Sequence, residues 1–217
     1  DAINAARAAY DALTAEEQEQ VSNYDVLEAA EEIYKGLLGD AVEIYDENGL
    51  REIAADGNYR LMSDIELTIP WNPVDSFAGT LDGNGHIISG LQISGAGFFA
   101  TTEEGAVIRN LGLEGSVNHP GFSPAGALVG RVRGTTAITD CYTNVAVTAD
   151  SMENVGGIAG EVLAPCIIEN CYSLGTLTGG TSFAYAGGII GRNGSTETTV
   201  SNCYTTAAKA VGYSDAA

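Results

Sequence analysis

Three tyrosines recur at a spacing that could build a ligand-binding surface. Tyr142, Tyr172 and Tyr204 each follow a cysteine directly. Tyrosine combines an apolar ring with a polar hydroxyl, which suits contact with sugar rings or partner proteins. If the cysteines point inward, strand alternation turns the tyrosines outward into a flat aromatic ladder. A purely structural role is the alternative, in which the rings shield the sheet surface or pack under a loop. Gly112 fills the position in an earlier copy, so the ladder is confined to the carboxyl-terminal part.

The four cysteines indicate buried thiols. Cys141, Cys171 and Cys203 share one repeat position, and Cys166 precedes the same phrase. No Cys-x-x-Cys or zinc-type spacing occurs. Cysteine behaves as a small apolar side chain in a core, and stacked parallel side chains pair poorly into disulfides. We therefore predict four free thiols.

Groups for catalytic or metal chemistry are sparse in this sequence. His86 and His119 are the two histidines and lie in different contexts, so a Ser-His-Asp triad or a histidine metal site has little material. Residues 82–85, Asp-Gly-Asn-Gly, are typical of a turn, and turn chemistry explains every one of them without a calcium ion. The sequence predicts no catalytic residue, no metal ligand and no cofactor.

The charge balance limits the class of partner. The 217 residues hold 29 acidic and 9 basic side chains, a net charge of −20, and residues 1–50 alone hold 13 acidic and 2 basic ones. Nucleic acids and anionic membrane surfaces both require a basic footprint. No apolar run is long enough to span a bilayer, and no signal peptide is present. We expect no nucleic-acid partner, no membrane insertion, and a monomeric segment of a longer protein.

Internal repeats position the tyrosines and cysteines. A glycine-flanked apolar phrase occurs at 96–100, 126–130, 156–160 and 187–191. A second phrase, which ends in Asn or Asp followed by Leu or Cys, occurs at 108–111, 138–141, 168–171 and 200–203, at offsets of 30, 30 and 32 residues. A third short run lies at 115–117, 144–147 and 175–177. Three short strands per unit predict a mainly β fold, a right-handed parallel β-helix, because single coils bury their apolar faces only by stacking.

Equivalent residues of successive coils should stack in columns. We expect interior columns of Phe98, Leu128, Ile158 and Ile189, of Ile108, Ile138, Ile168 and Val200, and of Leu111, Cys141, Cys171 and Cys203. A corner column of Asn110, Asp140, Asn170 and Asn202 suits the left-handed backbone conformation that these residue types tolerate. Arg131, Glu161 and Arg192 should form an outward column of alternating charge, in which each exposed pair is worth about 0–1 kcal/mol.

The amino-terminal residues predict a separate helical hairpin over 1–40, before a β-helix over 41–217. Thr14 and Glu17 form a capping-box pattern. Ser22 or Asn23 can cap a further helix, which Gly36 and Gly39 would end. Asn48 offers a cap for a short helix at about 48–55 that would cover the first coil. Early strands are expected at 59–67, 77–81 and 87–93.

Several phrases resemble a known family of surface β-helices. Residues 58–67 (NYRLMSDIEL), 71–74 (WNPV) and 77–86 (FAGTLDGNGH) look like the opening region of bacterial surface β-helices. The later Gly-Gly-Ile-Ile-Gly and Asn-Cys-Tyr phrases resemble GLUG-type repeats of adhesin-like proteins and of amino-terminal regions of immunoglobulin A1 proteases. Residues 1–38 more loosely resemble helical modules of Gram-positive wall proteins. The resemblance implies an extracellular, cell-surface or cell-wall location, adhesion, and no catalytic residues.

Three functions remain open at this stage. The preferred interpretation is a non-catalytic structural or adhesive segment of a larger secreted or cell-wall-displayed bacterial protein. The second is a module that binds carbohydrate or protein, with host or matrix glycans or proteins as partners of Tyr142, Tyr172 and Tyr204. The third is a polysaccharide-cleaving β-helix enzyme, which would need clustered acids, bases or a metal. The 10 acidic and 5 basic residues from position 101 onward are scattered instead.

Overall fold

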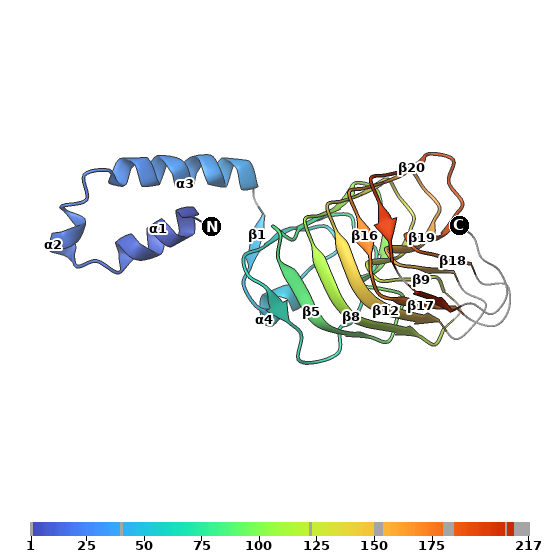
Figure 1. Cartoon of the computed structure of the whole chain (residues 1–217). Helices are drawn as coiled ribbons and strands as arrows, with labels where there is room; N and C mark the ends of the chain where they lie inside the picture. The colour runs from blue at the N-terminus through green and yellow to red at the C-terminus, as the bar shows by residue number, and fades with distance from the viewer. Residues whose placement is uncertain are drawn as a thin grey trace. The chain divides into compact units, whose positions relative to one another are not determined.

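The structure, a computed structural model, describes residues 2–39, 41–121, 123–149, 154–179, 185–206 and 208–210 (Figure 1). The chain divides into two compact units, Asp1–Ala41 and Val42–Ala217. In the described residues, the first unit is helical and the second is built mainly of parallel strands. Residues 211–217, the end of the predicted 41–217 domain, lie outside the described residues.

Three helices form the described part of the first unit: α1 (Ala2–Asp11), α2 (Ala15–Gln18) and α3 (Tyr24–Leu38). The capping box before α2 is confirmed, since Thr14 Oγ1 accepts the Glu17 N–H and the Glu17 carboxylate accepts the Thr14 N–H. Asn23 is the N-cap residue of α3 but makes no side-chain cap bond. The predicted stop at Gly36 is wrong, because α3 continues to Leu38 and ends at Gly39, whose φ of 62° breaks the helix.

Side-chain contacts hold α1 against α3. The Arg7 guanidinium makes a two-pronged bond to the Glu31 carboxylate, at 2.6 Å from Nε and 2.5 Å from Nη2. Paired, parallel bonds of this type fix orientation as well as distance. The rings of Tyr10 and Tyr24 stack beside this pair with centroids 4.3 Å apart. These contacts join residues 14 and 24 positions apart in the sequence and so define a helical hairpin.

The second unit is a parallel β-helix, as predicted. Each strand pairs in parallel with its equivalent one coil later, which builds four sheets in the described residues. One sheet holds β1 (Val42–Ile44), β2 (Asn58–Leu61), β4 (Thr80–Asp82), β7 (Ala106–Arg109), β11 (Thr136–Thr139), β15 (Cys166–Glu169) and β20 (Thr198–Ser201). The sheet that carries the tyrosines holds β3 (Ile65–Glu66), β5 (Ile87–Ile93), β8 (Gly112–His119), β12 (Tyr142–Ala149), β16 (Tyr172–Ser173), β17 (Thr176–Thr178), β21 (Tyr204–Thr205) and β22 (Ala208–Ala210). We call it the tyrosine sheet.

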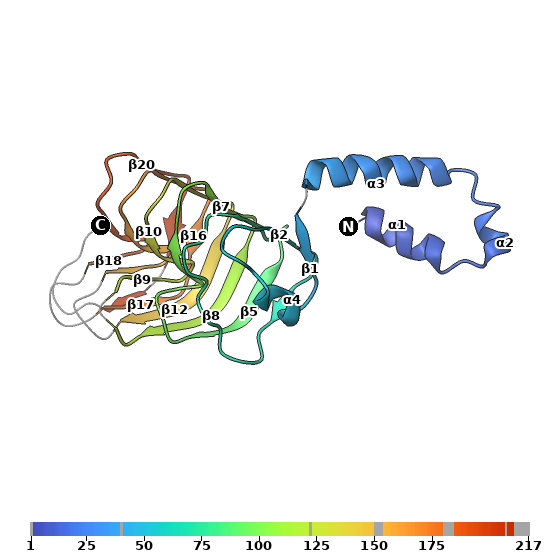
Figure 2. The ribbon, with the colours of Figure 1, turned by 180° about the vertical axis from the view of Figure 1, so that it is seen from behind.

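Two smaller sheets complete each coil. One holds β6 (Phe99–Thr102), β10 (Val129–Val132), β14 (Ala159–Val162) and β19 (Ile190–Asn193), and the other holds β9 (Ala125–Gly126), β13 (Val155–Gly156) and β18 (Ala186–Gly187). The predicted glycine-flanked strand is therefore two strands with a bend between them. A side chain at Gly126 could not fit this bend, because its Cβ would lie 2.2 Å from the Val129 carbonyl oxygen. Figure 1 shows β5, β8, β12 and β16 side by side, and Figure 2 shows β2, β7 and β10 from behind.

The first coils are less regular than the sequence predicted. The strand expected at 59–67 is split into β2 and β3, and the strand expected at 77–81 starts only at Thr80. Phe77 instead makes an isolated bridge to Thr102. The break between β2 and β3 is a corner at which the Asp64 carboxylate accepts the Ile87 N–H of the next coil at 3.0 Å. The strand expected at 87–93 is confirmed as β5.

The interior columns are confirmed in the middle coils. Ile108, Ile138 and Ile168 are fully buried. Val200, expected in the same column, is 47% exposed because no described coil covers it. The corner column is also confirmed, since its four members have φ between 52° and 54°. These members are Asn110, Asp140, Asn170 and Asn202. The column explains how the chain turns at equivalent points of successive coils.

The short helix before the first coil is α4 (Glu47–Arg51), not 48–55. Its N-cap is Asp46, whose carboxylate accepts the Gly49 N–H at 2.9 Å, so the predicted Asn48 cap is wrong. Asp46 has the extended backbone that an N-cap needs, and aspartate is as good a cap as asparagine. The Leu50 side chain is completely buried in the β-helix core. The helix therefore supplies apolar cover to the first coil, as expected.

Candidate functional site

The three tyrosines form one column at the start of their strands. Tyr142 pairs in register with Tyr172, and Tyr172 pairs with Tyr204. Each follows the left-handed corner residue and an inward-facing cysteine, so alternation turns the tyrosine to the outside. Tyr142 and Tyr172 are half-buried, whereas Tyr204 is 55% exposed. The predicted outward ladder is therefore confirmed as an arrangement.

The three rings form an offset parallel stack and do not lie flat in one plane. Ring centroids are 5.2 Å apart for Tyr142 and Tyr172 and 5.1 Å apart for Tyr172 and Tyr204, with interplanar angles of 7°. Parallel rings this close cannot lie in one plane, because their edges would collide, and they adopt the offset stack that aromatic pairs prefer. Neighbouring rings therefore cover part of each other's faces. Among the described residues no ring follows Tyr204, which is the most exposed of the three tyrosines.

Gly112 and Glu114 anchor the first ring of the ladder. The Tyr142 ring lies over Gly112, its register partner on β8. The Tyr142 hydroxyl donates a hydrogen bond of 3.1 Å to the Glu114 carboxylate. Burial, and then this bond, raise the pKa of Tyr142 to about 12. Tyr142 is therefore a neutral hydrogen-bonded phenol at physiological pH.

A histidine–carboxylate pair lies beyond this end of the ladder. Asp64 Oδ1 is 3.0 Å from His86 Nδ1 and also accepts the Ile87 N–H. The backbone bond, and then the His86 ring, lower the pKa of Asp64. Asp64 and His86 directly precede β3 and β5 of the tyrosine sheet, and Ile87 of β5 pairs with Gly112, so the pair lies next to the start of the ladder. The amino-terminal end of the ladder is thus acidic and hydrogen-bonding, and the other end is aromatic.

Three outward columns run parallel to the ladder on the tyrosine sheet. Glu114 pairs with Asn144, and the Leu174 N–H bonds to the Thr143 carbonyl, which places Leu174 beside Asn144. Leu174 is 39% exposed. Two further outward columns are Ser116, Ala146 and Thr176, and Asn118, Thr148 and Thr178. The aromatic stripe is therefore one ring wide, with Glu114, Asn144 and Leu174 beside it and short uncharged groups beyond them.

The charged column differs from the prediction in its burial. Arg131, Glu161 and Arg192 do align across three coils. However, the Glu161 side chain is only 6% exposed, although the column was expected on the outside. Its carboxylate accepts the Arg131 Nε–H at 2.7 Å, an Arg192 N–H, and the Asn154 amide at 3.3 Å. Three donors replace water around this carboxylate, so burial of its charge is tolerated.

All four cysteines lie in the described part of the chain and are free, as predicted. Cys141, Cys166 and Cys171 are buried, and Cys203 is half-buried. Burial raises the pKa of the Cys166 thiol to about 12. In the column, the neighbouring Cys171 thiol and burial raise the pKa of Cys141. These thiols fill the core, and the raised pKa values keep Cys141 and Cys166 protonated at neutral pH.

Within the residues described, no group of three or more His, Cys, Asp or Glu side chains could hold a metal ion. No helix in the described segments is long and apolar enough to cross a membrane.

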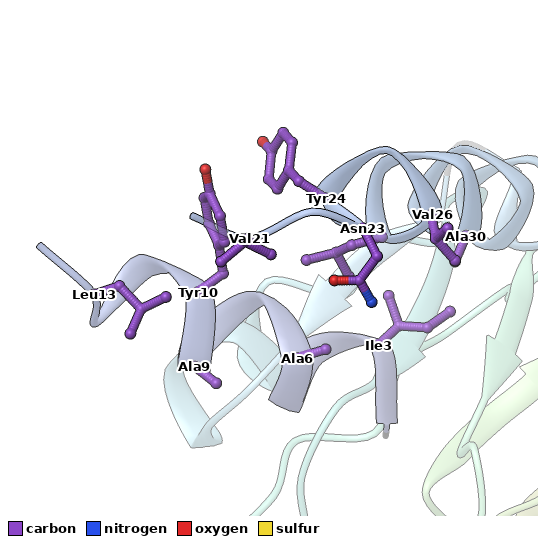
Figure 3. A pocket seen from close by; sticks show the side chains of 11 residues that line it. Ile3, Ala6, Ala9, Tyr10, Leu13, Val21, Asn23, Tyr24, Val26 and Ala30 are labelled. Carbon is purple, nitrogen blue, oxygen red and sulfur yellow. The ribbon is translucent and has the colours of Figure 1, made fainter. Parts of the chain in front are cut away.

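In the helical unit, an open groove of about 560 Å³ lies between α1 and α3. Figure 3 shows Ile3, Val26 and Ala30 at one end of this groove and Tyr10 and Leu13 at the other. Its lining is almost wholly apolar and offers no acid–base chemistry.

Comparison with known proteins gives partial matches. No family model matches the chain. It is similar to halomucin of Haloquadratum walsbyi, with 27% identity over 159 residues, which cover 61% of this chain and 2% of halomucin. It is also similar to the crystal structure of a "putative immunoglobulin A1 protease" from Bacteroides ovatus, with a TM-score of 0.48 and 16% identity over 79% of this chain and 77% of that one. The resemblance to GLUG-type repeats stays a prediction.

Proposed function

We propose that this chain is a non-catalytic structural and adhesive segment of a larger secreted or cell-surface protein. The observation that carries the proposal is the stack of equivalent coils, with one continuous apolar interior and one outward aromatic column. Such a solenoid is stabilised by contacts between neighbouring coils and presents long, regular faces to its surroundings. The tyrosine sheet is the face with aromatic side chains in register. It is our candidate for the adhesive surface.

The comparison with halomucin supports the idea of a segment. The matched region corresponds to 2% of halomucin, so similar sequence occurs there as a small part of a very long chain. A solenoid suits this context, because coils can be added without changing the packing of existing ones. The net charge of −20 also favours solubility outside the cell. We propose an extracellular or surface location on these grounds.

The groups around the ladder favour contact over cleavage. Acid–base catalysis at neutral pH works best with a pKa near the working pH. Tyr142 has its pKa at about 12, so it is a weak candidate for a general base. Glycoside hydrolysis uses two carboxyl groups on either side of the bond that breaks. Here the Asp64 carboxylate is engaged by His86 and Ile87, and that of Glu114 by Tyr142.

An adhesion assay combined with a product assay tests the proposal. Beads coated with the purified chain are allowed to settle on glycan-coated and matrix-protein-coated surfaces and are then washed under flow. The same protein is incubated with soluble polysaccharides, and reducing ends and unsaturated products are measured. We expect retention of the beads without product release. Sustained product release would show a polysaccharide-cleaving enzyme instead, and beads that bind no surface would contradict the adhesive role.

A further inference from the structure

The exposed aromatic stripe is too narrow for a typical protein interface. Tyr142 and Tyr172 are half-buried and partly cover each other. Within the ladder and the column beside it, the most exposed apolar side chains are Tyr204 at 55% and Leu174 at 39%. Specific protein interfaces bury about 800 Å² on each partner around a desolvated apolar centre. The column directly beside the ladder is Glu114, Asn144 and Leu174, and the next two columns are serine, alanine, threonine and asparagine. This pattern suits a thin ligand with apolar faces and many hydroxyl groups.

The charges around the ladder select against anionic ligands. The strands β8, β12, β16 and β21, all described, contain no lysine or arginine. Glu114 and Asp64 place carboxylates at one end of the ladder. An acidic polysaccharide would meet these carboxylates, and the four strands supply no cation to compensate them, so such contacts cost binding energy. An uncharged ligand meets no such barrier.

We propose that the tyrosine ladder binds a linear, uncharged glycan that lies along the β-helix axis. The inference deepens the proposed adhesive function and rests on it. The rung repeat of 5.1–5.2 Å is about the length of one hexose in an extended chain, so successive sugars can meet successive rungs. The exposed ring of Tyr204 stacks against one sugar ring. Further along the glycan, the Asn144 amide donates hydrogen bonds to sugar hydroxyls or accepts them, and the remaining lone pairs of the Glu114 carboxylate accept hydrogen bonds from hydroxyls.

Calorimetry and a glycan array with the full chain test this inference. The probes are neutral oligomers of glucose and of N-acetylglucosamine, together with uronic-acid oligomers of the same length. We expect binding of at least one neutral series, with an affinity that does not change between low and high salt. Tyr204→Ala should lower the affinity about tenfold, the scale of one lost aromatic stacking contact. Tyr45→Ala is the matched control, because Tyr45 is 58% exposed but lies outside the ladder.

The possible outcomes separate this inference from the proposed function. Binding of the uronic-acid series alone, or equal losses in Tyr204→Ala and Tyr45→Ala, would overturn the glycan site. Tyrosine-dependent adhesion of beads to protein surfaces, with no glycan bound, would also overturn it but would leave the adhesive role intact. Circular dichroism of both variants confirms that each is folded. Product release from the oligomers would contradict the proposed function itself.

Discussion

The ring of Tyr142 lies so close over Gly112 that a Cβ at Gly112 would be 2.4 Å from Cε1 and 2.9 Å from the hydroxyl oxygen of that ring. The two residues are register partners on adjacent strands. Glycine at this position thus makes room for the first ring of the ladder. The ladder begins at Tyr142 because Gly112, at the equivalent position of the preceding coil, has no side chain and leaves space for the Tyr142 ring.

Gly112→Ala should therefore displace the Tyr142 ring. We expect a loss of about 1–2 kcal/mol in the free energy of unfolding, the usual cost of an added group in a packed site. Chemical denaturation measures this change. In a Tyr142→Ala background the same substitution should cost much less, because the obstructing ring is gone. Equal costs in both backgrounds would show that the crowding has another source.

The Tyr142 hydroxyl provides a pH-dependent test. Burial and the Glu114 bond raise its pKa from 10.0 to about 12. The folded state therefore keeps its proton where the unfolded state loses it, so the stabilisation is complete below pH 10 and declines as the pH rises toward 12. Ultraviolet titration should show one tyrosine that ionises late. Glu114→Gln should shift this titration to lower pH, and an unchanged curve would argue against the bond.

The tyrosine ladder could be predicted from sequence because register and alternation are simple consequences of a repeat. Corner residues such as Asn170 mark where the chain turns, and the cysteine that follows fixes which face the tyrosine takes. The offset stacking of the rings could not be predicted, because it depends on the side-chain conformations that direct each ring toward the preceding coil. The repeats place Gly112 at the position equivalent to Tyr142, but they do not show that the Tyr142 ring packs directly over this glycine.

Contacts between distant segments account for the other differences. The burial of Glu161 depends on donors from Arg131, Arg192 and Asn154, which belong to three coils. A pattern of alternating charge indicated the register but gave no information on what covers the carboxylate. The Asp64–His86 pair was also missed, since its members are 22 residues apart in the irregular first coils. No repeat relates these two residues, so no spacing could have signalled the contact.

Replacement of Glu161 should test the buried charge cluster. Glu161→Gln leaves Arg131 and Arg192 without their shared carboxylate, and breaking a buried pair costs about 3–5 kcal/mol. We expect about 2 kcal/mol, because Arg131 and Arg192 are themselves 29% and 47% exposed and solvent screens them. The loss should persist at high salt. Glu103→Gln, which removes the exposed 4.0 Å contact to Arg133, is the control and should change stability by less than about 0.5 kcal/mol.

Thiol accessibility should separate the four cysteines. In the folded protein, a thiol reagent should modify half-buried Cys203 first and leave Cys141, Cys166 and Cys171 unmodified over the same period. The reactive species is the thiolate, and the Cys166 pKa of about 12 makes it scarce at neutral pH. Counting under denaturing, non-reducing conditions should find four free thiols. A count of two or fewer would show that neighbouring coils are joined by a disulfide.

The tyrosine ladder allows its structural and binding roles to be separated by position. Tyr172 stacks on a ring at each side, with centroids 5.2 Å and 5.1 Å away, whereas Tyr204 stacks on one described ring only. Each aromatic contact contributes about 0.5–1.5 kcal/mol. Tyr172→Ala should therefore lower the free energy of unfolding by about 2 kcal/mol and Tyr204→Ala by about 1 kcal/mol. Ligand affinity should fall more in Tyr204→Ala than in Tyr172→Ala, because Tyr204 is the more exposed of the two rings. Calorimetric binding and denaturant unfolding of both variants measure the two orders. The ladder is structural if Tyr204→Ala leaves the ligand affinity unchanged and the loss of binding free energy in Tyr172→Ala does not exceed its loss of unfolding free energy.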